Sequence, residues 1–318
     1  MTFMNLPKEL TLKLKKSKDL RYGENPHQKS AFYISDANPG FEQLAGIEIS
    51  HNNVGDANHA WHLVCEFDAP TVAIIKHGNP SGICTRADVA AAFKLAYEAD
   101  NVSAFGGIIA VNREPTVEMI NAMRGIFFEL IVAPDYSKEA LDALAAKSKR
   151  MRVVRAQKPP KQLEFTRAFN GYLVQTPDTV KETPLQWRVV SGKNPDKKTY
   201  GDLGFAWKVV KHVKSNAIVI VRDLNMLGMG TGQPNRVNSV KLALRQAQGK
   251  LNMGGKAVGA VLASDAFFPF EDSVELAAAA QISTIIQPGG SINDKRVIDD
   301  AKKHNITMIF THIRHFKH

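Results

Sequence analysis

The stretch from Thr71 to Gly82, TVAIIKHGNPSG, shows the pattern that decides the fold. Its first six residues, Thr71–Lys76, are mostly apolar or β-branched and predict a strand that is buried on both faces. The strand leads directly into a polar turn rich in glycine and proline, and Lys76 and His77 stand where the turn begins. Strands of this kind are typical of sheets that helices cover on both sides.

Similar strands alternate with amphipathic helices on either side of this stretch. In the first half we expect strands at 107–111, 130–133 and 152–155 and helices at 88–99, 116–124 and 138–149. In the second half we expect strands at 217–221, 257–262, 284–286 and 307–310 and helices at 200–213, 237–248, 273–281 and 294–303. The two halves have a similar order of elements, although we find no convincing residue-level repeat. This order predicts an α/β protein with a first unit over 1–160 and a second over 161–318, connected within 157–198.

The composition excludes several classes of protein. Of the 318 residues, 44% are hydrophobic and 23% are charged, so a normal core can form and wholesale disorder is excluded. Cys65 and Cys84 are too few for a disulfide framework and lack C-x-x-C spacing, so we expect a reduced, intracellular protein. We expect no signal peptide and no membrane partner, because even the longest uncharged run, 276–293, contains glycine, glutamine and proline.

The surplus of positive charge is concentrated in the middle of the chain. The formal net charge is +10, and residues 138–214 alone hold 17 basic and 7 acidic side chains. A basic region can serve nucleic acid, a membrane surface, small anions or merely solvation, and composition does not choose among these. A non-catalytic module that binds nucleic acid is therefore one alternative. We nevertheless expect no nucleic-acid partner, because the region lacks interleaved aromatic residues and any known binding motif.

Two polar stretches follow predicted strands and have residue types that suit acid–base catalysis or the binding of an anion. In KHGNPSG, the histidine is a residue type that titrates near neutral pH, and the adjacent lysine can stabilise a developing oxyanion. The alternative is a lysine that caps the strand beside a structural histidine. In GMGTGQPNR, residues 228–236, the glycines allow a close approach to an anion and Arg236 can pair with a carboxylate or phosphate. The alternative is a tight turn, since the spacing fits neither a dinucleotide fingerprint nor a P-loop.

Four further stretches could belong to a site, and three of them have two readings each. RYGENPHQ at 21–28 is either a surface turn or a site, and SDAFFPFEDS at 264–273 is either core or the wall of a site for a flat heterocycle. Within the latter, Asp272 is either a polar anchor or the cap of the next helix. QPGGS at 287–291 is a turn before a helix, and the tail RHFKH is either frayed or docked. Metal-hydrolase and deaminase motifs are absent from the sequence, so we expect no catalytic metal.

Taken together, eight segments resemble the formyltransferase part of the bifunctional purine-biosynthesis enzymes that also carry IMP cyclohydrolase. In chain order they are RYGENPHQ, KHGNPSG, SAFGG, KSN, GMGTGQPNR, SDAFFPFEDS, QPGGS and FTHIRHFKH. The resemblance implies transfer of the formyl group of 10-formyltetrahydrofolate to the 5-amino group of the ribonucleotide AICAR, which yields FAICAR and tetrahydrofolate. It also implies a role in cytoplasmic IMP biosynthesis. A catalytically impaired or regulatory paralogue is an alternative.

The resemblance gives individual residues expected roles. It makes His77 the general base and Lys76 the stabiliser of the tetrahedral intermediate, with Asn216 close to the chemistry. The positions that match those holding AICAR are Arg21, Tyr22, Gly106, Glu129, Arg314 and Phe316. The positions that match those around the folate are Arg236, Phe267, Asp272 and Ser291.

The resemblance also implies an architecture, and this sequence departs from the family in two ways. The family fold is a pair of cytidine-deaminase-like α/β/α units with mixed sheets and without the deaminase zinc. Its active sites lie at a homodimer interface and use residues of both chains. We expect no cyclohydrolase domain in this chain, because RYGENPHQ begins at Arg21, so ring closure would need an IMP cyclohydrolase partner. His312 stands where the family usually has glycine.

Overall fold

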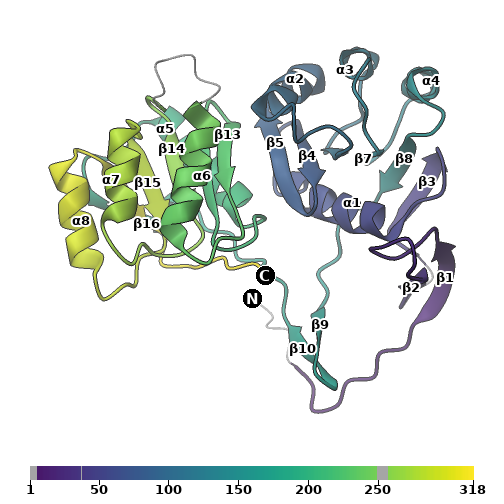
Figure 1. Ribbon diagram of the computed structural model, residues 1–318, viewed down its shortest axis with the longest axis horizontal. Helices are drawn as coiled ribbons and strands as arrows, with labels where there is room; N and C mark the ends of the chain where they lie inside the picture. The colour runs from purple at the N-terminus through teal and green to yellow at the C-terminus, as the bar shows by residue number, and fades with distance from the viewer. Residues whose placement is uncertain (1–5, 37, 249–256) are drawn as a thin grey trace.

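The computed structural model describes residues 6–36, 38–248 and 257–318. Most of its strands join one continuous, mixed sheet of 12 strands, and two small two-stranded sheets lie outside it. Figure 1 shows two sets of helices side by side, with β5 (Asn79–Thr85) and β13 (Asn225–Gly230) next to each other at the centre. The predicted α/β class with mixed strand directions is confirmed.

The first half of the large sheet and its helices comprise β3 (Phe41–Ala45), α1 (His51–Val64), β4 (Thr71–Lys76), β5, α2 (Val89–Ala99), β6 (Ile108–Val111), α3 (Val117–Ala122), β7 (Leu130–Ala133), α4 (Lys138–Lys147) and β8 (Arg152–Ala156). The second half comprises β11 (Arg188–Ser191), α5 (Lys197–Val210), β12 (Ile218–Arg222), β13, α6 (Arg236–Gln248), β14 (Val261–Ser264), α7 (Asp272–Ala279), β15 (Thr284–Gln287), α8 (Asp294–Lys303) and β16 (Thr307–Phe310). The small sheets are β1 (Lys15–Leu20) with β2 (Ser30–Ile34) and β9 (Glu164–Ala168) with β10 (Gly171–Gln175).

Most expected elements are present, but two loops were predicted wrongly. β5 and β13 were expected as glycine-rich turns, whereas each is the second strand of a tight hairpin. Their small and polar residues are buried at the centre of the sheet, where a helix presses on them and leaves no room for large side chains. Helix α1 was not predicted, because its first turns are polar and include Gly55. The strand expected at 257–262 lies at Val261–Ser264.

The same strand order and strand directions occur twice in the large sheet. The first half has the order β5-β4-β6-β7-β8 and the second has β13-β12-β14-β15-β16. In each, the first two pairings are antiparallel and the last two are parallel. An antiparallel strand, β3 or β11, closes each outer edge. The halves meet where β5 and β13 pair at Cys84 and Asn225.

The matching topology exposes a residue-level repeat that inspection of the sequence missed. The pattern G-D-x-x-x-A-W-x-x-V occurs at 55–64 in α1 and at 201–210 in α5, an offset of 146 residues. The same offset relates the two hairpin turns, at 77–78 and 223–224. The expectation of no convincing residue-level repeat is therefore wrong. The repeat is hard to detect in the sequence because few of its residues are identical outside this helix.

In both repeats an aspartate of the helix holds the hairpin turn. Asp56 accepts hydrogen bonds from the backbone N–H groups of His77 (3.0 Å) and Gly78 (2.7 Å). Asp202 accepts from Asp223 (3.0 Å) and Leu224 (2.7 Å) in the same way. All four turn residues have positive φ, between 52° and 73°. For a residue other than glycine this conformation costs about 1–2 kcal/mol, so the aspartates stabilise turns that are otherwise strained.

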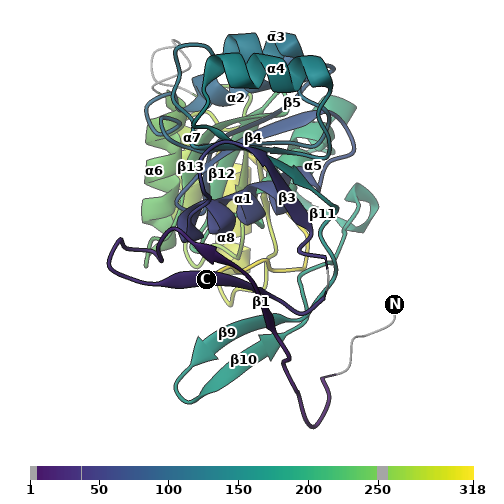
Figure 2. The same cartoon turned by 90° about the vertical axis from the view of Figure 1, so that its right-hand side faces the viewer.

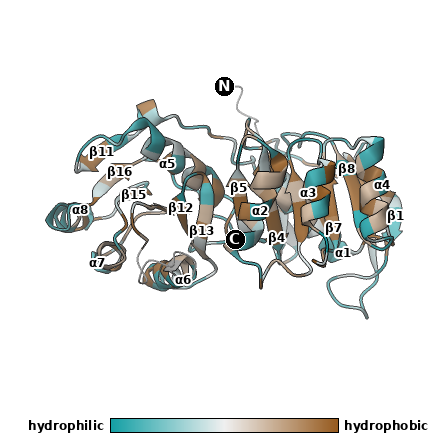
Figure 3. Ribbon diagram, turned by 90° about the horizontal axis from the view of Figure 1, so that it is seen from above, coloured by the Kyte–Doolittle hydropathy of each residue, from teal (hydrophilic) through white to brown (hydrophobic). Residues whose placement is uncertain are grey.

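Three clusters of buried side chains form the core. One cluster contains the inner faces of both α1 and α5, so it runs across the two halves. On the opposite face of the strands, α2–α4 cover the first half and α6–α8 the second. Glu66 reinforces the junction through an ion pair with Lys211 (2.9 Å) and a backbone carbonyl that accepts from Lys208 (2.9 Å). Figure 3 shows the apolar strands enclosed between these helices.

The small hairpin β9–β10 projects from the body of the molecule in two perpendicular views (Figures 1 and 2). It carries exposed apolar side chains, including Phe169 and Leu173. No helix among the described residues is long and apolar enough to span a membrane.

The paired aspartates lead to a prediction about stability. Asp56→Asn and Asp202→Asn should each destabilise the protein by about 1–3 kcal/mol, because an NH2 group replaces one of the two acceptor oxygens and leaves one backbone N–H without its acceptor. Urea denaturation followed by circular dichroism measures this, with the exposed Asp142→Asn as a control that should change little. An effect confined to one of the two aspartates would contradict their structural equivalence.

Candidate functional site

A cavity of about 550 Å³ opens beside the β4–β5 turn and is the best candidate for a site. This volume lies within the range of roughly 300–1,000 Å³ that is usual for small-molecule sites. Segments far apart in the sequence meet there: the turn after β1, the start of α1, the end of β4 and the loops before β7 and β8. The cavity brings together six of the residues predicted for the site, namely Arg21, Tyr22, Lys76, His77, Gly106 and Glu129.

Lys76 and His77 lie at the mouth of this cavity for different local reasons. Lys76 is the last residue of β4, and its Nζ donates to the carbonyl oxygen of Phe105 at 2.7 Å. His77 is exposed, and its positive φ of 53° turns the chain away from the strand. Because Asp56 fixes the backbone of the turn, the exposed His77 side chain projects from a rigid support.

One wall of the cavity is a glycine turn bordered by aromatic rings. Gly106 has a φ of 74°, which favours glycine, and its N–H donates to the carbonyl oxygen of Phe127 at 2.9 Å. The rings of Phe105 and Phe127 lie 5.4 Å apart and both are substantially exposed. A side chain at Gly106 would meet the Phe127 ring. This wall therefore offers bare backbone and an aromatic surface to a flat ligand.

Glu129 is held at the cavity by a buried arginine. The Arg152 guanidinium contacts the Glu129 carboxylate at 2.5 Å and also donates twice to the carbonyl oxygen of Glu48. The Arg152 side chain is only 4% exposed, whereas that of Glu129 is 36% exposed. The arginine is thus a support, and the carboxylate is the group available to a ligand.

The charges around the cavity favour an anion. Arg21, Lys76, Arg150 and Arg152 line it, against two carboxylates, Asp56 and Glu129. Arg21 lies over the ring of Tyr22, with its guanidinium carbon 5.5 Å from the ring centroid. Among the described residues, neither Arg21 nor Arg150 pairs with an acidic side chain. Two cations are therefore available to a phosphate or carboxylate group.

Asn216 and Arg236 form a separate polar network in the second half. Arg236 is 7% exposed, and its guanidinium donates to Asp265 at 2.5 Å, to Ser264 at 2.9 Å and to the side-chain oxygen of Asn216 at 2.6 Å. Arg236 does pair with a carboxylate, as its residue type suggested, but the partner is Asp265 of its own chain. Its structural effect is to orient Asn216.

This network lies close to the β4–β5 hairpin. The side-chain oxygen of Asn79, two residues after His77, accepts from the Thr231 hydroxyl at 2.9 Å and from the Lys214 backbone N–H at 3.4 Å. The segment 214–216 is therefore adjacent to the turn that bears His77, although Asn216 does not line the cavity.

Two of the three glycines of GMGTG, Gly228 and Gly230, have a packing role, and the prediction of an anion loop at these two positions is wrong. Both lie in β13 against α6, where a Cβ would be 2.1 Å from the Ala243 carbonyl oxygen and 1.9 Å from that of Ser239, respectively. Gly82 in β5 has the same relation to Ala96 of α2, at 1.8 Å. Glycine is required because each helix touches the backbone of its hairpin.

The other predicted residues lie in the second half, away from the cavity. Phe267 is 37% exposed, whereas its neighbour Phe268 is buried. Asp272 is the first residue of α7 and is not the N-cap, so the capping interpretation is wrong. Ser291 accepts a hydrogen bond from the Asn293 N–H within the turn before α8. Arg314 and Phe316 lie together in the C-terminal tail, which is docked rather than frayed.

His312 has a backbone conformation that explains why glycine suits its position. Its φ is 62°, and its N–H donates to the Pro288 carbonyl oxygen. Its side chain lines a different cavity, of about 660 Å³, between β11, α8 and the end of β16. The imidazole is therefore absent from the lining of the cavity that contains Arg21.

Sequence reasoning missed two residues that organise the site, Asp56 and Arg152. A usable signal existed only for Asp56, in the repeated G-D pattern of α1 and α5. Arg152 lies in a predicted strand, and nothing in its sequence context distinguishes it from a surface arginine. Within the described ranges, no group of three histidine, cysteine or acidic side chains is arranged to hold a metal ion.

Comparisons with known proteins show which family the chain resembles. A family model described as "AICARFT/IMPCHase bienzyme" matches residues 2–246. A bifunctional purine biosynthesis protein PurH from Streptococcus equi subsp. zooepidemicus is 47% identical over 323 aligned positions, and those from Streptococcus pyogenes and Streptococcus thermophilus are 46% identical. Each alignment covers 98% of this chain and 62% of the relative, so the chain spans less than two thirds of their length.

The packing role of the glycines can be tested by substitution. Gly230→Ala should destabilise the protein by about 1–3 kcal/mol or more, because the new methyl group overlaps the backbone of α6. The matched control is Gly204→Ala in α5, where a Cβ would meet nothing within 4 Å and the substitution should stabilise by about 0.5–1 kcal/mol. Thermal denaturation compares the two. Equal stability of both variants would rule out the packing role.

Proposed function

The chain belongs to the AICARFT/IMPCHase bienzyme family, and we propose that it is the formyltransferase that converts AICAR to FAICAR. The formyl donor is 10-formyltetrahydrofolate and the second product is tetrahydrofolate. The observation that carries this proposal is the convergence of Lys76, His77, Arg21, Tyr22, Gly106 and Glu129 on one cavity.

The cavity suits the nucleotide in charge and shape. AICAR bears a phosphate, and Arg21 and Arg150 are cations without an acidic partner among the described residues. Its imidazole ring is flat, and the rings of Phe127 and Tyr22 line the cavity. Glu129 supplies an acceptor for amino, amide or hydroxyl groups of the ligand, since Arg152 holds its carboxylate in place.

The reaction needs a base and an oxyanion stabiliser beside each other. The 5-amino group is a poor nucleophile because the aromatic ring withdraws its lone pair, so attack on the formyl carbon requires removal of a proton. His77 accepts that proton while Lys76 stabilises the negative oxygen of the tetrahedral intermediate. The bond from the formyl carbon to N10 of the folate then breaks, and the proton passes from His77 to N10.

The folate site and the quaternary structure complete the proposal. Phe267, Asp272, Ser291 and Arg236 surround the folate, and Asn216 lies beside the reacting groups. Because these residues and the tail lie outside the Arg21 cavity, we assign the complete site to a homodimer in which both chains contribute residues. The exposed apolar side chains of the β9–β10 hairpin support such an interface.

The wider context follows the family. FAICAR is ring-closed by an IMP cyclohydrolase, which is either fused to this chain or a separate partner, and the pathway is cytoplasmic. The direct test mixes purified protein with AICAR and 10-formyltetrahydrofolate and follows tetrahydrofolate by absorbance. No change above a control without enzyme would refute the proposed activity, and specific retention of nucleic acid in a gel shift would favour the alternative module.

His77→Ala should lower kcat by roughly 10²–10⁴, the usual contribution of a general base. The matched control is Asp223→Ala, at the equivalent position of the second turn, which should leave kcat within about twofold, since only one of the two turns borders the cavity. Steady-state kinetics at saturating substrate measures both. Near-wild-type turnover by the His77 variant would remove that residue from catalysis.

The two turn aspartates should also separate stability from activity. Asp56→Asn should lower kcat by about tenfold or more, because small displacements of a catalytic group are costly. Asp202→Asn, with a similar loss of stability, should retain activity at a temperature where both variants are folded. Equal kinetic losses in the two variants would indicate a general effect of destabilisation instead.

A further inference from the structure

The C-terminal tail presents two exposed side chains on either side of a buried histidine. The guanidinium carbon of Arg314 lies 4.3 Å from the centroid of the Phe316 ring, so the two form a stacked pair. Between them, the His315 side chain is only 1% exposed. In an extended segment alternate residues face opposite sides. The His315 side chain therefore points into the protein, while Arg314 and Phe316 point away from it.

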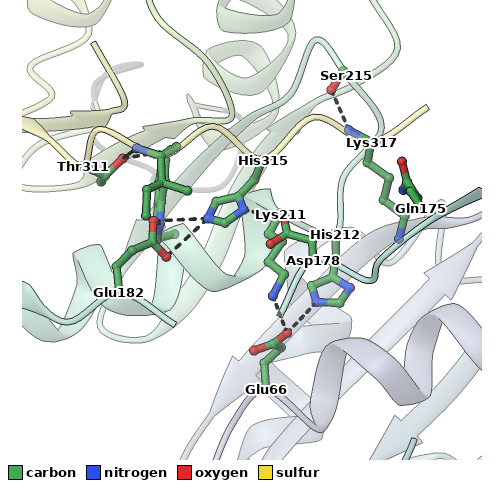
Figure 4. A network of polar contacts seen from close by, with 12 residues as sticks. Glu66, Gln175, Asp178, Glu182, Lys211, His212, Ser215, Thr311, His315 and Lys317 are labelled. Atoms are coloured by element: carbon green, nitrogen blue, oxygen red, sulfur yellow. Dashed lines mark hydrogen bonds and ion pairs between the residues drawn. The ribbon is translucent and has the colours of Figure 1, made fainter. Parts of the chain in front are cut away.

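His315 lies beside two carboxylates, those of Asp178 and Glu182 (Figure 4), and an indole ring packs against it. Its Nδ1 lies 2.5 Å from Asp178, and its Nε2 lies 3.3 Å from both oxygens of Glu182. The Trp207 ring packs edge-on at 5.2 Å, and the indole N–H donates to the same Glu182 carboxylate at 3.0 Å. Because both ring nitrogens face acceptors, both must donate, and the imidazole is positively charged.

These contacts connect three separate parts of the chain. The tail follows β16, the two carboxylates lie in the connection between β10 and the short 3-10 helix Pro184–Gln186, and Trp207 belongs to α5. Backbone hydrogen bonds place the tail beside Asp265 and Ser215. Between Arg314 and Phe316, the His315 side chain adds contacts to the connection that follows β10.

We propose that His315 is a positioning residue for the nucleotide site, whose charged contact with Asp178 and Glu182 fixes the orientation in which Arg314 and Phe316 meet AICAR. The inference rests on the proposed function, in which that pair belongs to the AICAR site. His315 itself has no role among the residues assigned there.

The charged contact of His315 with Asp178 and Glu182, here called the clamp, weakens as pH rises. The groups that face the imidazole are Asp178, Glu182 and the uncharged Trp207 ring, and Lys211 acts on it indirectly, through Asp178. Burial lowers the pKa of His315, but the hydrogen bonds and charges of the two carboxylates outweigh burial and raise the pKa to about 9. Since the folded pKa is the higher one, the clamp is complete below the ordinary pKa of 6.5 and is lost as pH rises through about 9.

The test compares His315→Asn with the control His304→Asn, a histidine at the surface end of α8. The asparagine amide retains a donor near the Nδ1 position but not the charge. The KM for AICAR should rise on the order of tenfold in the His315 variant while kcat changes much less, because the affected pair binds substrate and does not transfer protons. In the wild type and the control, the KM for AICAR should rise as pH passes about 9. In the His315 variant, the KM for AICAR should not change over the same pH range.

Two further measurements keep the proposal falsifiable. Asp178→Asn removes the more exposed carboxylate and should raise the KM in the same direction without unfolding the protein. Hydrogen exchange of residues 311–318 should be faster in the His315 variant whether or not the protein has formyltransferase activity, so an inactive wild type would refute only the proposed function. An unchanged KM for AICAR in an active His315 variant, or unchanged exchange of the tail, would overturn the positioning role.

Discussion

The Asp56 carboxylate, which accepts both N–H groups of the turn formed by His77 and Gly78, is the interaction on which the site depends. It holds a non-glycine residue at positive φ and ties the β4–β5 hairpin to α1. β5, the second strand of this hairpin, pairs with β13 at the junction of the two halves. Asp56 therefore supports the candidate site and a hairpin at the centre of the large sheet at the same time.

A comparison of the two equivalent turns shows why only the first one belongs to the candidate site. Asp202 holds the second turn in the same way, but the residues equivalent to Lys76 and His77 are Arg222 and Asp223. Asp223 contacts Lys198 at 2.6 Å and Arg222 at 3.8 Å, so its charge is compensated locally. The first turn instead borders a cavity with unpaired cations. Identical backbone support therefore produces a candidate active site only where the side chains remain available to a ligand.

Much of this fold could be predicted from the sequence, because its buried strands and amphipathic helices have distinct periods. Strand β4 was predicted with the bounds it has, whereas β5 and β13 were missed because their glycines, which make room for α2 and α6, suggest loops. Six of the residues predicted for the site from the order of the motifs do line one cavity. Asp56, Arg152 and His315 were assigned no role, since their functions depend on partners more than 20 residues away that only the folded chain brings near.

We propose that the cavity beside the turn held by Asp56 binds AICAR for formyl transfer at His77. A crystal structure of the protein with AICAR tests this most directly. We expect the nucleotide in the cavity lined by Arg21, Tyr22 and Gly106. Its phosphate should lie at Arg21 and Arg150, and its 5-amino group should lie within hydrogen-bond distance of the His77 imidazole. Density for AICAR in the cavity between β11 and α8, or with the amino group remote from His77, would contradict it.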